Sequence, residues 1–118
     1  MKEQIINIDI YKRSVVILQD GCVGDICKWL EEHNATDIAQ SVREEDWDTA
    51  NAITFSDGLD VFIISPKQIE VKTLAHELTH ATFKVLKIAG INPVQEEEAF
   101  AYLYEYLYDK AINEKEEK

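Results

Sequence analysis

The chain has 118 residues, of which 46% are hydrophobic and 30% are charged. This composition is typical of a globular protein, and the length suits one domain that buries a core without disulfides, which excludes an intrinsically disordered chain. The formal net charge of -11, from 23 acidic and 12 basic side chains, repels phosphate backbones and anionic lipids, so we expect neither nucleic acid nor a membrane as a partner.

The N-terminal residues predict a β-hairpin. Residues 4–11 alternate apolar and polar side chains, as a half-buried strand does, and residues 14–18 form a second β-branched run after a polar break. The connection lacks a Gly or Asn, so the register of this hairpin is not defined by its turn residues.

Two helices are expected next, at residues 25–33 with Asp25 as the N-cap and at residues 36–42. Cys22 and Cys27 are separated by four residues, which matches neither a zinc knuckle nor a redox Cys-x-x-Cys pair. We therefore interpret both as reduced thiols, with Cys27 on the buried face of the first helix.

A second hairpin is predicted from residues 50–55 and 59–64, because Asp57-Gly58 between them offers the positive φ that a tight turn needs. If the protein binds a partner by strand addition, residues 59–64 are the expected edge strand.

The C-terminal third predicts an antiparallel helical hairpin. A long helix covers residues 68–89 and ends at Gly90, and a second helix starts with Asn92 as N-cap and Pro93 in its first turn and runs to Ala111. The predicted fold class is α+β: a small antiparallel sheet of about four strands with an antiparallel pair of C-terminal helices.

We expect residues 1–112 to form this single domain and residues 113–118, which lack an apolar anchor, to be a solvated tail. The sequence shows no signal peptide pattern and no apolar run near 18 residues, which predicts a cytoplasmic protein.

Residues 76–80 read His-Glu-Leu-Thr-His within an apolar stripe at helical spacing. Positions i and i+4 share one helix face about 6 Å apart along the axis, so His76 and His80 can bind one metal ion. Glu77 projects beside them, where a carboxylate can take a proton from a metal-bound water. This spacing predicts a zinc hydrolase with Glu77 as general base.

A catalytic zinc site needs a third protein ligand, and the acidic candidates lie on the following helix. Helix geometry alone leaves four of them open: Glu96, Glu97, Glu98 and Glu105. Tyr102, one turn after Glu98, is the phenol best placed to stabilise the oxyanion of a tetrahedral intermediate, although its side chain also suits simple packing.

The motif at residues 76–80, followed by Glu98-Ala99-Phe100-Ala101, resembles the gluzincin metallopeptidases. The chain is also similar to short proteins with this motif from bacteriophages and other mobile elements. The resemblance covers about residues 70–108. It implies a zincin-like fold, Zn²⁺ held by His76, His80 and Glu98, Glu77 as general base, and a peptide or protein substrate.

The predicted function is thus zinc-dependent peptide hydrolysis. The alternative is a non-catalytic zinc-binding module, or pseudo-peptidase, that acts through protein–protein contacts, because a chain of 118 residues leaves little protein for the far wall of a substrate cleft.

Overall fold

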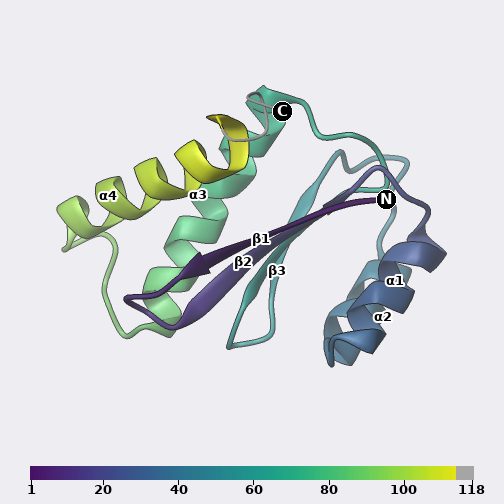
Figure 1. The fold of residues 1–118 in the computed structure, drawn as a ribbon, viewed down its shortest axis with the longest axis horizontal. Helices are drawn as coiled ribbons and strands as arrows, with labels where there is room; N and C mark the ends of the chain where they lie inside the picture. The colour runs from purple at the N-terminus through teal and green to yellow at the C-terminus, as the bar shows by residue number, and fades with distance from the viewer. Residues whose placement is uncertain (114–118) are drawn as a thin grey trace.

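The structure is a computed structural model that describes residues 1–113 (Figure 1). Its strands are β1 (Lys2–Ile8), β2 (Arg13–Gln19), β3 (Ile53–Ser56) and β4 (Val61–Ile64). Within the described residues they form one four-stranded sheet in the spatial order β1-β2-β4-β3. Its helices are α1 (Val23–Glu32), α2 (Thr36–Glu44), α3 (Val71–Ile88) and α4 (Glu97–Tyr108), followed by a π-helical turn, Asp109–Asn113.

Both predicted hairpins are confirmed, since β1 pairs with β2 and β3 with β4 in antiparallel fashion. The prediction of an entirely antiparallel sheet is wrong, because β2 and β4 are parallel and make the sheet mixed. The physical reason is that β2 and β4 are continuous apolar runs buried on both faces, as central strands are, and helices α1 and α2 carry the chain between the two hairpins. The predicted α+β class is confirmed in this mixed form.

The edge strand is also corrected. We expected residues 59–64 at the edge, but β4 lies between β2 and β3, and β3 forms the edge on that side of the sheet. All four residues of β4 are buried, whereas those of β3 are half-buried. The strand with the stronger apolar pattern therefore takes the interior position.

The sheet separates two hydrophobic cores, because side chains alternate between its faces. Helices α3 and α4 cover one face and α1 and α2 cover the other, which gives three layers (Figure 1). The sheet residues buried against α3 and α4 are Ile6, Ile8, Val15, Ile17, Val61 and Ile63. Those buried against α1 and α2 are Val16, Leu18, Phe62 and Ile64.

Gly90 ends α3 as predicted. Its φ is +79°, its N–H donates to the Lys87 carbonyl at 3.0 Å, and the N–H of Ile91 donates to the Leu86 carbonyl at 2.9 Å. These two bonds define a Schellman motif, which satisfies the last carbonyls of the helix. The chain then reverses so that α4 packs against α3.

The start of α4 differs from the prediction. Asn92 Oδ1 does accept bonds from the amides of Val94 and Gln95, at 3.0 and 3.3 Å, but this caps an isolated turn. The chain leaves helical geometry at Glu96, with φ -105° and ψ 66°, and α4 begins at Glu97. The later start places two acidic residues in the first turn, where the helix dipole favours negative charge.

The N-cap of α1 is Cys22 rather than the expected Asp25, whose backbone N–H donates to Cys22 Sγ at 3.4 Å. Both cysteines are free thiols, and Cys27 lies on the buried face of α1, as predicted. Of the predicted tail, Asn113 closes the π-helical turn and residues 114–118 lie outside the described residues. Within residues 1–113, no helix combines the length and apolar character that crossing a bilayer requires.

Candidate metal centre

Helix α3 carries the predicted motif on its outer side. Its apolar stripe, which includes Leu74, Leu78, Ala81 and Val85, is buried against the sheet. His76 and His80 fall on the opposite side of the helix and are exposed, because helical spacing of 100° per residue turns them away from that stripe. Glu77 lies at the boundary between the two sides and is buried.

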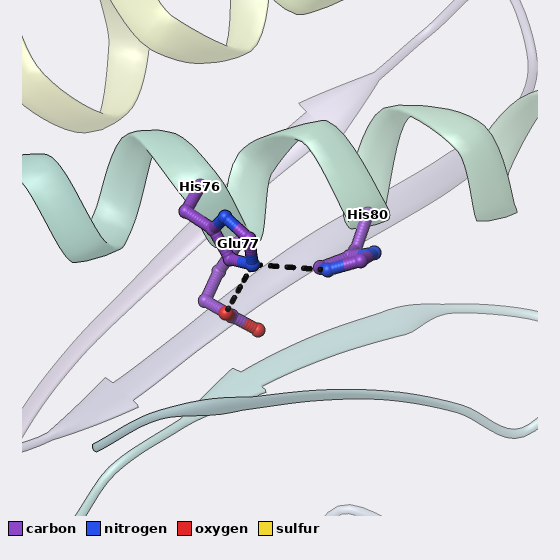
Figure 2. Close-up of side chains that lie close together, drawn as sticks. All are labelled: His76, Glu77 and His80. Carbon is purple, nitrogen blue, oxygen red and sulfur yellow. Dashed lines mark hydrogen bonds and ion pairs between the residues drawn. The ribbon is translucent and has the colours of Figure 1, made fainter. Parts of the chain in front are cut away.

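The three polar side chains of the motif meet in space. The Nε2 atoms of His76 and His80 are 3.3 Å apart, and Glu77 Oε2 lies 3.8 Å from His76 Nε2. One ligand atom from each of the three residues lies within 4.8 Å of the other two. Figure 2 shows the side chains projecting from the same side of α3, away from the ribbon of α4 in that view.

This donor set fits a divalent transition metal. Two imidazole nitrogens bound to a tetrahedral zinc ion at about 2.05 Å are separated by about 3.3 Å, and the two Nε2 atoms have this separation. Imidazole nitrogen with carboxylate oxygen is a zinc-type ligand set, whereas Mg²⁺ and Ca²⁺ prefer oxygen ligands alone. The group can therefore hold a metal ion, and its residues are of the type that zinc accepts.

Glu77 has a different environment from the histidines. Its side chain is 9% exposed, against 69% for His76. Thr54 Oγ1 donates a hydrogen bond to Glu77 Oε1 at 2.8 Å and lies 3.3 Å from the Glu77 carbonyl oxygen. The carboxylate is therefore anchored through Oε1 to the edge strand β3, while Oε2 faces the histidines.

Sequence reasoning missed Thr54. It precedes Glu77 by 23 residues and belongs to no motif. Its position beside the helix follows from the pairing of Thr54 with Ile63 in the β3–β4 hairpin, since Ile63 faces α3 and directly opposite residues share a face. If the register of the β3–β4 hairpin were known, the alternation of side chains along β3 would predict that Thr54 faces α3.

The structure does not bring the predicted third ligand to this group. Glu98 is exposed in the first turn of α4, and the other three candidate glutamates are exposed as well. Within residues 1–113, the metal-holding group consists of His76, Glu77 and His80. The ligand role of Glu98 stays a prediction.

Tyr102 also lies apart from this group. Tyr102 is 70% exposed and lines a surface hollow of about 450 Å³ together with residues 8–11, which are the end of β1 and the start of the turn after it. The tyrosine that reaches α3 is Tyr104, whose hydroxyl donates to the Ala75 carbonyl at 3.4 Å. Tyr104 lies on the same face of α4 as Phe100, and both pack against the core. Tyr102 is instead exposed to solvent.

Comparison of the chain with protein-family models, with curated proteins and with solved structures finds no match.

Proposed function

We propose that the protein is a zinc-dependent metallopeptidase of minimal gluzincin type with a zincin-like fold. The observation that carries the proposal is the pair of imidazole nitrogens 3.3 Å apart with a buried carboxylate beside them on one helix. Metal-assisted hydrolysis needs ligands for the metal and a base that is shielded from solvent. Here one helical turn carries two nitrogen ligands and such a base.

The roles follow from the chemistry of each side chain. His76 and His80 would hold the metal through Nε2. Zinc, when bound, supplies a Lewis acid that lowers the pKa of a coordinated water toward about 7. Glu77 accepts a proton at Oε2, the oxygen that Thr54 does not bond, and later gives it to the leaving amine of the peptide.

The third protein ligand in this proposal is Glu98, with Glu96, Glu97 and Glu105 as alternatives. Changing each glutamate to glutamine in turn, with zinc stoichiometry and affinity as the readout, identifies the ligand. The true ligand shows the largest loss of affinity, while the other three variants match the wild type.

A peptide is the proposed substrate class because of the strand beside the site. β3 is an edge strand of the sheet and carries Thr54, which bonds Glu77. An extended peptide can add to such an edge through main-chain hydrogen bonds, with its scissile bond near the helix that bears His76 and His80.

The test of this function is a Glu77→Gln variant assayed against a peptide library. The amide cannot take up the proton, so we expect turnover to fall by about 10²-fold or more, while zinc content stays near that of the wild type. Glu32→Gln, a change of the same type at an exposed position of α1, is the matched control, because α1 lies on the face of the sheet opposite α3. Equal turnover by the Glu77→Gln variant would mean that the mechanism is wrong.

One observation favours the non-catalytic alternative, namely that no glutamate of α4 joins the metal-holding group of the described residues. A module of this kind binds zinc and gains stability from it but hydrolyses no peptide. Zinc-dependent melting without turnover in the library assay would select this alternative.

A further inference from the structure

The metal-holding group consists of His76, Glu77 and His80, but the proposed mechanism uses only its two histidines as metal ligands. Glu77 Oε2 is 3.8 Å from His76 Nε2, so the carboxylate lies close enough to the two imidazoles to compete for the metal. A carboxylate that binds the metal can no longer act as a free base. If Glu77 is to act as the general base, another contact must keep its carboxylate from binding the metal.

Thr54 is placed to do this. Its Oγ1 bonds Glu77 Oε1 at 2.8 Å, from the side of β3 and not from the side of the histidines. The hydroxyl has a single proton, which is donated to the carboxylate at the shorter distance; the only other acceptor of this hydroxyl in the described residues is the backbone carbonyl of Glu77, at 3.3 Å. Both contacts thus tie one residue of the edge strand to one residue of α3.

The anchor is also stiff. Threonine is β-branched, so its χ1 angle is restricted, and Thr54 is fixed opposite Ile63 by the antiparallel β3–β4 pairing. Glu77 is buried, so few water molecules can replace the hydroxyl as a hydrogen-bond donor.

We propose that Thr54 is a positioning residue that keeps the Glu77 carboxylate out of the metal's coordination shell and available as general base. This inference rests on the proposed function only for the role it assigns to Glu77. The hydrogen bond itself determines the ligand set whether or not a peptide is hydrolysed.

The test uses Co²⁺ alone as the probe, because its visible absorption reports the number and type of its ligands. Thr54→Val keeps the shape of the side chain but removes the donor. We expect this variant to bind Co²⁺ more tightly with an altered spectrum, because the released carboxylate becomes a ligand. Thr54→Ser keeps the hydroxyl and should retain the wild-type spectrum.

Combination with Glu77→Gln completes a double-mutant cycle. In the wild-type background the Glu77 change should alter the Co²⁺ dissociation constant less than about twofold, and in the Thr54→Val background it should weaken binding about tenfold or more and restore the wild-type spectrum. Circular dichroism monitors folding of every variant, and Thr54→Ala replaces Thr54→Val in the same cycle if the latter does not fold.

An unchanged Co²⁺ spectrum and affinity in folded Thr54→Val and Thr54→Ala would overturn the inference and leave the proposed function standing. Conversely, absence of peptide turnover in the wild type would overturn the proposed function, while the Co²⁺ cycle still decides the role of Thr54. If the wild type turns over peptide, Thr54→Val should lower kcat with little change in KM and Thr54→Ser should recover it. Failure of the wild type to bind Co²⁺ would overturn both.

Discussion

The two cysteines show how burial sets the chemistry of a single residue. Cys27 is 0% exposed, its Sγ donates to the Ala39 carbonyl at 3.5 Å, and burial raises the pKa of its thiol. Cys22 is exposed. Because the thiolate is the reactive form, we expect iodoacetamide to label Cys22 in the native protein and Cys27 only after unfolding.

Mass spectrometry of the labelled protein checks this expectation. The native wild type should gain one adduct and the denatured protein two. A Cys22→Ser variant is the control and should gain none while folded. Two adducts on the native wild type would show that the core between the sheet and helices α1 and α2, which contains Cys27, opens on the timescale of labelling.

The candidate site could be predicted only in part at the residue scale. His76, Glu77 and His80 lie within five residues of one helix, so helical spacing alone predicts that they meet. The contact between Thr54 and Glu77 depends instead on strand register and on the packing of α3 against β3, neither of which local sequence determines.

At the scale of the element, the end of α3 depends on one glycine. Gly90 has φ +79°, which costs an L-amino acid with a Cβ about 1 to 2 kcal/mol. A Cβ added there meets no atom within 4 Å, so the penalty comes from the backbone alone. We expect Gly90→Ala to lower the free energy of unfolding by about 1 kcal/mol in urea titrations.

Gly24→Ala is the matched control, because Gly24 lies within α1 with ordinary helical geometry. The added Cβ would lie 3.9 Å from Cys22 Sγ, an ordinary van der Waals distance. Since alanine is the better helix former, this variant should gain about 0.5 to 1 kcal/mol. A loss of similar size in both variants would contradict the role assigned to the backbone of Gly90.

Whether a segment forms a helix or a strand could be predicted more readily than the segment with which it pairs. Alternation, β-branched runs and the Asp57-Gly58 turn predicted both hairpins, because these signals are local. The parallel contact between β2 and β4 joins segments more than 40 residues apart in sequence, and local pattern says nothing of it. The true start of α4 was missed for a related reason, since Asn92 supplies a real cap but the turn it begins stops at Glu96.

At the scale of the whole molecule, the position of the metal-holding group couples it to the fold. His76 and His80 project from α3, whose other side supplies Leu74, Leu78 and Val85 to the core beneath α4. Unfolding of this helix separates the two imidazoles and removes the site. Metal binding is therefore expected to stabilise the entire domain and not a local loop.

The size of this effect follows from mass action. A ligand that binds only the folded state adds about 2.7 kcal/mol when it is present at 100 times its dissociation constant, which raises Tm by roughly 10 °C in a domain of this length. We expect this rise in calorimetry with Zn²⁺, its reversal by a chelator, and its loss in His76→Ala and His80→Ala. Mg²⁺ should give a much smaller shift, because its preferred ligands are oxygen atoms.

His33→Ala supplies the control for loss of a histidine as such. His33 lies at the end of α1, where it stacks on Trp29 with ring centroids 3.7 Å apart and bonds the Trp29 carbonyl, so it takes no part in the metal-holding group. This variant should keep the full Zn²⁺ response.

If the His76→Ala/His80→Ala double variant still gained stability from Zn²⁺, the ion would be binding to the acidic surface, because a net charge of -11 attracts cations without any built site. Loss of the response in that variant, with its retention in His33→Ala, ties the stabilisation to the two imidazoles of α3.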